Sequence, residues 1–554
     1  MVYSNITQKV DHFSDSSTAT WIQVSDFSQY FQSLYSGLVT IYVPRSRTLY
    51  RPGKSRFQRY QYNSKFYNAS TGIVFLMIGG EGAVVPPGFW SFKPDSYSWN
   101  ARMAFAGSIS PPGDKWVRDE SITMMQWAKE YGAAAFQLEH RFYGPKENSP
   151  TGKQDTGSLK LLSIDQALED IKEFINQMNA RYFAGTKTHW VTFGGSYPGS
   201  LSAFFRETYP EYTIGAMSSS SAVHVFVDYY GYLVHTEENY RAESNNCAEY
   251  IRTAFINMQK LAYSGQNGRE QLQNIFDLCD PFDEYNVAKS MQFFYSNVIG
   301  YFQGINQYSG DNRNEATRNG LGIPMACQIM NNETLGDEMT RVKKIMDWYV
   351  TMNGGTVDCY PNSYKEFVRI YSDISYSNSL LDDVVATRSW IWQTCTELGY
   401  FQTTDGGNYG IFGSTLPVDF YSDQCTALFG PEYTLTSTYQ SVAAVLRKYG
   451  GADAYRGTKV CFPNGSIDPW KSLGHLNSNA ANKVQAYLID GTAHCADMYP
   501  ASPNDRKSLT DTRALLKSQL NDWIKDALAP TGSSSNSGLI TTVAILLCFI
   551  YVRI

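Results

Sequence analysis

The sequence predicts an α/β protein in which a mostly parallel sheet carries helices on its faces and is interrupted by a large helical insertion. Three observations predict it. Short apolar segments alternate with amphipathic helical segments over about the first 220 residues, which is typical of parallel sheets. From residue 221 to 430 the pattern becomes long and helical, with six cysteines and irregular aromatic loops. Strand-like segments then return near Val460.

The expected elements follow in order along the chain. We predict strands at residues 73–78, 133–138, 190–193 and 214–217, with helices at 122–130, 164–178 and 200–208. Later strands are predicted near residue 460 and at 484–489, before an amphipathic helix at 509–528. The predicted domains are a first core part (1–220), a cap insertion (221–430), a second core part (431–528), and a polar spacer with an apolar tail (529–554).

The strand predicted at residues 190–193 runs directly into glycines around Ser196 and then into a helix. This pattern indicates a nucleophile elbow, a sharp strand-to-helix turn that lifts a serine hydroxyl clear of the sheet. Small neighbours are needed because a side chain there would collide with the turn. The usual glycine two residues after the serine is replaced by Pro198, with Gly199 following. Proline is tolerated in the first turn of a helix, so the elbow is still predicted.

A serine hydrolase of this kind also needs an acid and then a histidine, each on a loop after a late strand. Asp468 follows the strand predicted near residue 460, and His494 follows the strand at 484–489 through a turn of small residues. The order serine, acid, histidine is that of an α/β-hydrolase. We therefore predict Ser196 as nucleophile, His494 as general base and Asp468 as the group that orients the imidazole.

Hydrolysis through a serine also needs two backbone N–H donors for the negative oxygen of the tetrahedral intermediate. One is expected from Tyr197, directly after the nucleophile. The other is expected from the Gly-Gly-Glu-Gly loop after the strand at 73–78, with Gly80 or Glu81 as donor. The loop lacks the spacing of a phosphate-binding loop, which argues against a nucleotide site.

Composition limits the partners and cofactors. The formal net charge is −6, and a nucleic-acid partner would require clustered basic residues. No nucleic-acid partner is therefore expected. Eight of the nine cysteines lie before the tail, and none forms a Cys-x-x-Cys pair, so neither a metal nor another cofactor is expected. An even number of cysteines suits four disulfides formed in an oxidising compartment, although the sequence alone permits many pairings.

Six motifs resemble one known family. They are Gln8–Phe13, Gly79–Gly82, Glu139–Gly144, Gly194–Gly199, Asn464–Trp470 and His494–Asp497. Their types and their order resemble the family that contains prolyl carboxypeptidase, dipeptidyl peptidase II and thymus-specific serine protease. The Ser-Tyr-Pro-Gly-Ser and His-Cys-Ala-Asp variants are most similar to the thymus-specific branch.

The resemblance implies an α/β-hydrolase core with a helical cap, and a serine exopeptidase that acts on short peptides, often after proline. It implies that Trp470 lines the pocket for the residue before the scissile bond. It also implies three disulfides, Cys247–Cys327, Cys279–Cys359 and Cys395–Cys425. Cys461 and Cys495 remain: either they form a fourth disulfide that ties the acid and base loops together, or they are buried free thiols.

Two other functions are weighed against the peptidase. A small-ester or lipid hydrolase would keep the fold and the triad, but a long apolar lid helix would favour it, and the aromatic, cysteine-rich cap does not. A catalytically silent binding module would have lost a triad residue, and none is lost. Within the peptidase hypothesis, the sequence does not separate a carboxypeptidase from a dipeptidyl peptidase. A homodimer is considered as its assembly.

Signals at both ends favour the secretory pathway. Glycosylation sequons occur at Asn5, Asn68 and Asn332, and a fourth at Asn464 is interpreted as part of a turn. The first residues lack the apolar core of a signal peptide, so we expect a start near the mature end or a truncated one. The polar spacer and apolar tail predict a tether to the membrane, either a GPI anchor or a short tail anchor. An extracellular, cell-surface or lysosomal location follows.

Overall fold

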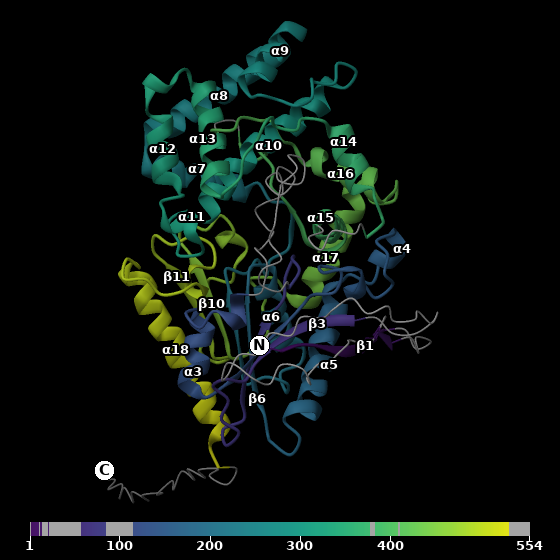
Figure 1. Ribbon diagram of the computed structural model, residues 1–554, viewed down its shortest axis with the longest axis vertical. Coiled ribbons are helices and arrows are strands. Elements are labelled where there is room, and N and C mark those ends of the chain that lie inside the picture. Colours follow the sequence, from purple (N-terminus) through teal and green to yellow (C-terminus); the bar gives the residue numbers. More distant parts are fainter. Residues whose placement is uncertain are drawn as a thin grey trace, which may run out of the picture.

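A computed structural model describes residues 2–9, 12–13, 20–21, 57–84, 115–376, 383–407 and 410–530. Within them a nine-stranded sheet forms the lower half of the molecule, in the order β11-β10-β7-β6-β4-β5-β3-β1-β2 (Figure 1). Its strands are β1 (Val2–Lys9), β2 (Thr20–Trp21), β3 (Phe57–Asn63), β4 (Ile73–Ile78), β5 (Ala134–Leu138), β6 (His189–Gly195), β7 (Gly215–Ser219), β10 (Val460–Gly465) and β11 (Val484–Ile489).

Six neighbouring strands of this sheet, from β11 to β5, are parallel. The edge formed by β3, β1 and β2 is antiparallel. The predicted strands are therefore confirmed, but the antiparallel edge was not predicted. In a parallel sheet all carboxyl ends face the same side, so the loops after β4, β6, β7, β10 and β11 meet at one edge.

Both faces of the sheet are buried, as in other parallel sheets. On β4, Ile73, Phe75 and Met77 belong to one hydrophobic cluster, while the alternate residues belong to the other. The first cluster is covered by α3 (Thr123–Tyr131) and α18 (Lys507–Leu528). The second is covered by α5 (Ile164–Tyr182) and α6 (Tyr197–Thr208). This arrangement is an α/β-hydrolase core.

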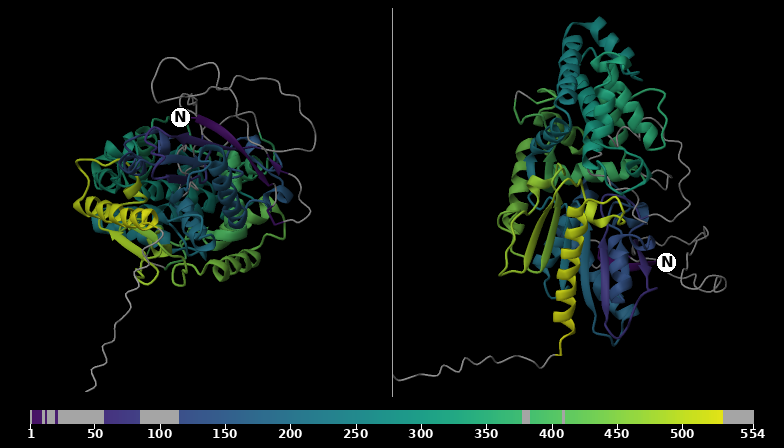
Figure 2. Two further views of the ribbon diagram at one scale, coloured as in Figure 1. Left: turned by 90° about the horizontal axis from the view of Figure 1, so that it is seen from below. Right: turned by 90° about the vertical axis from the view of Figure 1, so that its left-hand side faces the viewer.

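A helical cap stands above the carboxyl edge of the sheet (Figures 1 and 2). Its helices are α7 (Gly231–Glu243), α8 (Asn245–Tyr263), α9 (Gln266–Ile275), α10 (Val287–Gln307), α11 (Glu315–Arg318), α12 (Ile323–Met330), α13 (Glu338–Met352), α14 (Tyr364–Tyr371), α15 (Asp383–Gln393) and α16 (Val418–Phe429). From Met291 onward nearly every residue of α10 is buried, which is typical of a helix through the middle of a domain.

Shorter elements complete the described chain. A two-stranded parallel ribbon joins β8 (Phe226–Asp228) to β9 (Gly399–Phe401), next to the π-helical turn η3 (Thr394–Leu398). The remaining pieces are α2 (Lys115–Arg118), η1 (Lys146–Asn148), α4 (Thr156–Leu159), η2 (Glu333–Leu335), α17 (Leu435–Tyr449), η4 (Lys471–Leu473) and η5 (Ala496–Met498). In the described part of the chain, no helix has the length and apolarity needed to cross a membrane.

Three disulfides form as the family resemblance implied. Cys247–Cys327 joins α8 to α12, Cys279–Cys359 joins two loops of the cap, and Cys395–Cys425 joins η3 to α16. All three lie within the insertion, so they link its helices to one another.

The expected fourth disulfide is wrong, because Cys461 and Cys495 are free and buried. Cys461 on β10 is in register with Met217, whereas the Cys495 sulfur lies 3.9 Å from the carbonyl oxygen of Ser219. Two residues along β7 separate these levels by about 7 Å, too far for a disulfide. Hydrogen bonds tie the acid and base loops instead: Ile467 N–H donates to the Thr492 carbonyl at 3.1 Å.

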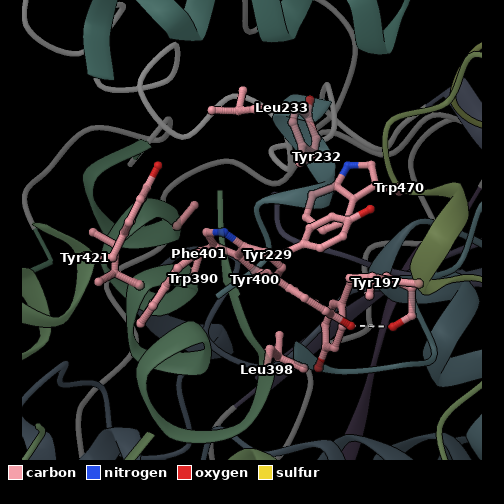
Figure 3. Packing of buried hydrophobic residues seen from close by; sticks show 14 of the residues in the cluster. Tyr197, Tyr229, Tyr232, Leu233, Trp390, Leu398, Tyr400, Phe401, Tyr421 and Trp470 are labelled. Carbon is pink, nitrogen blue, oxygen red and sulfur yellow. Dashed lines mark hydrogen bonds between the residues drawn. The ribbon is translucent and has the colours of Figure 1, made fainter. Parts of the chain in front are cut away.

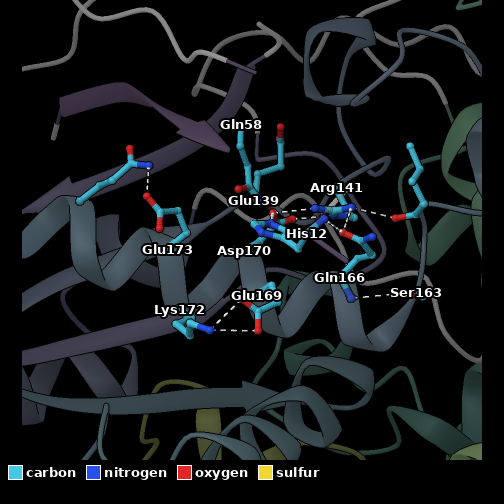
Figure 4. Close-up of polar contacts among 12 residues, drawn as sticks. His12, Gln58, Glu139, Arg141, Ser163, Gln166, Glu169, Asp170, Lys172 and Glu173 are labelled. Carbon is cyan, nitrogen blue, oxygen red and sulfur yellow. Dashed lines mark hydrogen bonds and ion pairs between the residues drawn. The ribbon is translucent and has the colours of Figure 1, made fainter. Parts of the chain in front are cut away.

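A buried ionic network fixes the end of β5 against α5 (Figure 4). Arg141 donates to both carboxylate oxygens of Asp170, at 2.6 and 2.7 Å, and His12 bonds to the same carboxylate at 3.0 Å. Such two-pronged pairs are strong and directional. Glu139 pairs separately with Arg59 and accepts the N–H of Val84 at 2.6 Å. The Glu-His-Arg segment therefore supports the loop after β4.

A carboxylate from the helical cap also binds the N-terminus of a core helix. Glu397 in η3 accepts the N–H of Ile164, the first residue of α5, at 3.0 and 3.2 Å from its two oxygens. Negative charge is favourable at a helix N-terminus. Burial nevertheless raises the pKa of Glu397 from 4.5 to about 8.

Replacing Glu397 by Gln should change how stability depends on pH. The folded state keeps the Glu397 proton between about pH 4.5 and 8 while the unfolded chain releases it, so rising pH destabilises the wild type across this window. Glutamine cannot ionise but still accepts the Ile164 N–H. We expect the Tm of Glu397→Gln, relative to wild type, to rise from pH 5 to pH 9. A constant difference across that range would contradict the shifted pKa.

Candidate active site

Ser196 stands in a sharp turn between β6 and α6. Its φ of 64° and ψ of −135° place it in a strained region of backbone conformation. The turn requires close approach, because a Cβ on Gly194 would lie 2.1 Å from the carbonyl oxygen of Pro198. Pro198 lies in the first turn of α6, where its missing N–H costs nothing. This is the geometry of a nucleophile elbow.

Asp468 and His494 face each other in the loops after β10 and β11. The Asp468 carboxylate is 2.8 Å from Nδ1 of His494, and both side chains are almost fully buried. Asp468 also accepts the N–H of Trp470 at 2.9 Å, which fixes its carboxylate. Burial alone lowers the pKa of His494, but the facing carboxylate outweighs it and holds that pKa well above its ordinary value. Asp468 therefore stabilises the imidazolium, as a triad acid should.

Ser196 and His494 meet in one open cleft, which Gly80 and Gly82 also line. Within the described residues, Nε2 of His494 has no hydrogen-bond partner, so the Ser196–His494 bond is not made in this conformation. Such bonds are often longer in ligand-free enzymes and tighten when substrate binds. An aromatic wall of Trp116, Tyr308 and Tyr499 closes the other side of the cleft.

The loop after β4 lies directly against the elbow. A Cβ on Gly80 would come 2.6 Å from the Pro198 ring, so only glycine fits there. This contact brings the backbone of Gly80 next to the first turn of α6, which begins at Tyr197. Gly80 and Tyr197 therefore stay our expected oxyanion donors. Glu81 is different: it is fully buried and is not among the described residues that line the cleft.

Ser219 and Ser220 at the end of β7 join all three catalytic segments, and the sequence did not single them out. The Ser219 carbonyl accepts the N–H of Ser196 at 2.9 Å, and the Ser219 hydroxyl donates to Asp497 at 2.6 Å. The Ser220 hydroxyl accepts the N–H of Cys495 at 2.8 Å. The Ser220 N–H donates to the Pro463 carbonyl on β10 at 2.7 Å. No sequence signal marks this pair beyond its position after a strand.

The last residue of α10 fastens the cap to the histidine loop. The Gln307 carbonyl accepts the N–H of His494 at 3.0 Å. The Gln307 side-chain oxygen accepts the Trp470 indole N–H at 3.0 Å and the Tyr232 hydroxyl at 2.7 Å. The cap therefore takes part in holding both the base and Trp470, two residues after the acid.

Trp470 lies in a buried aromatic cluster next to the triad (Figure 3). Its ring stacks on Tyr229, with ring centroids 5.5 Å apart, and meets Tyr400 edge-on at 5.3 Å. Tyr400 in turn stacks on Trp390, which meets Tyr197 edge-on. Trp470 is only 3% exposed and does not line the open cleft. The cluster extends from the acid loop to the residue after the nucleophile.

The site offers no metal centre within the described residues, where no group of three His, Cys, Asp or Glu side chains is placed to hold an ion. Cys495 lines the cleft, and burial raises the pKa of its thiol. Thiols with a raised pKa are poor nucleophiles. Ser196, and not Cys495, is therefore the expected nucleophile of this site.

Replacing Ser219 by Ala should impair catalysis more than folding. The change removes the donor to Asp497, whose pKa burial already raises to about 6, and loosens the loop that carries His494. We expect kcat to fall about 10- to 100-fold, the usual effect of a misplaced catalytic group. Ser296→Ala is the control, since this buried serine bonds within α10. Equal losses in the two variants would contradict the role of Ser219.

Known proteins resemble this chain over most of its length. The model of the family described as serine carboxypeptidase S28 matches residues 92–516. A Caenorhabditis elegans relative whose name describes a serine protease is 34% identical over 554 residues, 99% of this chain and 89% of its own. Thymus-specific serine protease of Mus musculus is 27% identical, and lysosomal Pro-X carboxypeptidase of Homo sapiens 23%; each match covers 85% of this chain and 84% of the relative.

Among solved structures, a proline iminopeptidase of Mycobacterium smegmatis aligns with 85% of this chain and 97% of its own, at 10% identity and a TM-score of 0.31. We draw no conclusion from so low a score. The family match covers more than half of the chain and agrees with the elbow, the acid–histidine pair and the helical cap. The chain belongs to the serine carboxypeptidase S28 family and is a serine-type peptidase.

Proposed function

We propose that the protein is an exopeptidase that cleaves short peptides through an acyl-enzyme on Ser196. The observation that carries this proposal is the buried Asp468–His494 pair in one cleft with a serine at a strained elbow. The cap, fastened to the histidine loop through Gln307, restricts entry to the ends of peptides. Ser196 and Gly80 line the same cleft, where the reacting carbonyl would bind.

In the proposed reaction His494 Nε2 takes the proton from Ser196 as its oxygen attacks the peptide carbonyl. The negative oxygen is held by the N–H groups of Tyr197 and Gly80. The imidazolium, stabilised by Asp468, then gives its proton to the departing amine. Water attacks the resulting ester by the same route and restores the serine.

We further propose that the aromatic cluster forms the pocket for the residue before the scissile bond. Trp390, Tyr400 and Trp470 are flat, apolar rings packed in series next to Tyr197. A proline ring is rigid and apolar, and it suits such faces. A relative named lysosomal Pro-X carboxypeptidase supports the same preference.

The proposed location is the secretory pathway. Three disulfides support it, since they persist in oxidising compartments. Asn68 and Asn332 are exposed, as glycosylated asparagines must be, whereas Asn464 is only 1% exposed. The side chain of Asn5 and the tail from residue 531 onward lie outside the described residues, so glycosylation at Asn5 and a membrane tether stay proposals from the sequence.

Replacing Ser196 by Ala should abolish cleavage. Mass spectrometry of short peptides, with proline moved stepwise from each end, measures both the products and their lengths. The variant should lose about a million-fold in kcat, as other triad hydrolases do. Trimming of the same peptides by Ser196→Ala at an undiminished rate would contradict the proposed nucleophile.

Replacing Trp470 by Leu should weaken the preference for proline. The change removes the flat face but leaves an apolar residue, and we expect kcat/KM for a proline peptide to fall about 10- to 200-fold. The matched control is Trp392→Leu, because Trp392 packs against Phe429 and Tyr433, on the cap. The pocket hypothesis fails if both variants keep the wild-type ratio between proline and alanine peptides.

A further inference from the structure

Glu81 is a buried carboxyl group that the mechanism leaves unexplained. Its side chain is 0% exposed, and neither of its oxygens has a hydrogen-bond partner within the described residues. Other buried acids near the site are satisfied: Asp468 pairs with His494, Asp497 with Ser219, and Glu139 with Arg59. Buried polar groups are nearly always paired, so an unpaired carboxyl group next to an active site is a candidate for contact with a ligand.

The position of Glu81 connects the cleft to the aromatic cluster. The two residues beside it, Gly80 and Gly82, both line the cleft with Ser196. Its charge interacts with that of His494. It also interacts with the hydroxyls of Tyr197 and Tyr400, two members of the aromatic cluster. The carboxyl group therefore lies near both the catalytic histidine and the aromatic cluster.

Within the described residues Glu81 has no hydrogen-bond or ion-pair partner, although the charge of His494 acts on it. Among the described residues that line the cleft there is no lysine or arginine. Burial raises the pKa of Glu81 to about 8, so near neutral pH the carboxyl group is protonated in the ligand-free enzyme. An arriving cation would replace that proton as the partner of the carboxylate, and the proton would leave to solvent.

We propose that Glu81 binds the α-ammonium group of an unblocked peptide N-terminus and so directs the enzyme to cleave near the amino end of its substrates. Every unblocked peptide carries this ammonium group. It lies within one or two residues of a bond that is cleaved near the amino end. Its binding would satisfy the buried carboxylate and hold the peptide carbonyl against the Gly80 loop. This proposal rests on the peptidase function proposed above and specifies its substrate.

The opposite specificity would need a cation for the C-terminal carboxylate of the substrate. One described candidate is Arg313, whose guanidinium carbon lies 3.7 Å from the ring centre of Tyr308, a cleft residue. Arg313 is thus already stacked on the cleft wall, and neither Arg313 nor Glu81 itself lines the cleft. Glu81 is flanked by two lining residues and has both oxygens unpaired, so the geometry favours the amino end.

The first test needs no variant. The full chain is given one peptide sequence in three forms: with both ends free, with the N-terminus acetylated, and with the C-terminus amidated. We expect acetylation to lower kcat/KM about 100-fold, the scale for removing one partner of a buried charge pair, and amidation to change it little. Equal cleavage of the free and acetylated peptides overturns the proposal. Cleavage that instead depends on a free C-terminus also overturns it and points to Arg313.

The second test uses Glu81→Gln, which keeps the shape and removes the charge. We expect it to lose about 100-fold in kcat/KM on the free peptide and to show little loss on the acetylated one. Glu397→Gln is the matched control, because Glu397 is another carboxyl group whose pKa burial raises to about 8, and it has a hydrogen-bond partner. The control should discriminate between the two peptides as the wild type does. Equal losses of Glu81→Gln on both peptides would indicate a structural role and overturn the proposal.

Labelling with a fluorophosphonate probe separates this inference from the function on which it rests. The probe reacts with an activated serine and has no peptide terminus, so Glu81→Gln should be labelled at the wild-type rate. If the wild type cleaves no peptide in a Ser196-dependent way, the peptidase function fails. If it cleaves peptides but ignores acetylation, only the assignment of Glu81 fails.

Discussion

The Ser219–Ser220 pair is the constraint on which the catalytic arrangement depends. Ser196, Asp468 and His494 come from segments separated by up to about 300 residues, and each of these segments has a hydrogen bond to this pair. The carbonyl of Ser219 holds the elbow, and its hydroxyl holds the histidine loop. The Ser220 hydroxyl bonds to the same loop. Its backbone N–H bonds to β10, the strand that precedes Asp468. Positive φ at Ser196, Ser220 and Cys495 shows how tightly the three turns are drawn together.

The parallel sheet makes this meeting possible, and the cap completes it. Because β6, β7, β10 and β11 are parallel neighbours, their following loops leave at one edge and need only short turns to meet. The end of α10 then closes over that edge through Gln307, which bonds to His494 and Trp470. Cap and core therefore both hold the catalytic loops, so a shift of α10 would displace His494.

The sequence predicted what depends on local patterns and missed what depends on packing. Strands and helices of the core, and the pairing of Asp468 with His494, followed from periodicity and from the order of motifs. Ser219, Ser220 and Gln307 carry no such signal, because their roles depend on which backbone groups happen to face them after folding. The antiparallel edge begins with strands that have no distinctive pattern. The expected Cys461–Cys495 disulfide failed because the two cysteines lie at different levels of the sheet.

The pattern of charges in the site could not be predicted from the sequence either. Glu81 was selected for its backbone, as a donor for the oxyanion, and its side chain became informative only when its burial and its lack of partners were known. His140 shows the opposite case, since burial lowers its pKa to about 4 and the Tyr197 hydroxyl satisfies its ring at 3.1 Å. His140 therefore supports the site through its own hydrogen bonds, whereas Glu81 is the group that we propose binds the substrate.

The measurement that tests the account most directly is the crystal structure of the protein with a peptide boronic acid, a mimic of the tetrahedral intermediate. The account predicts a bond from boron to the Ser196 oxygen. One boronate oxygen should accept the N–H groups of Tyr197 and Gly80, and another should contact Nε2 of His494. A boronate bonded to another residue, or one bonded to Ser196 with its oxygens turned away from both amides, would contradict the proposed catalytic arrangement.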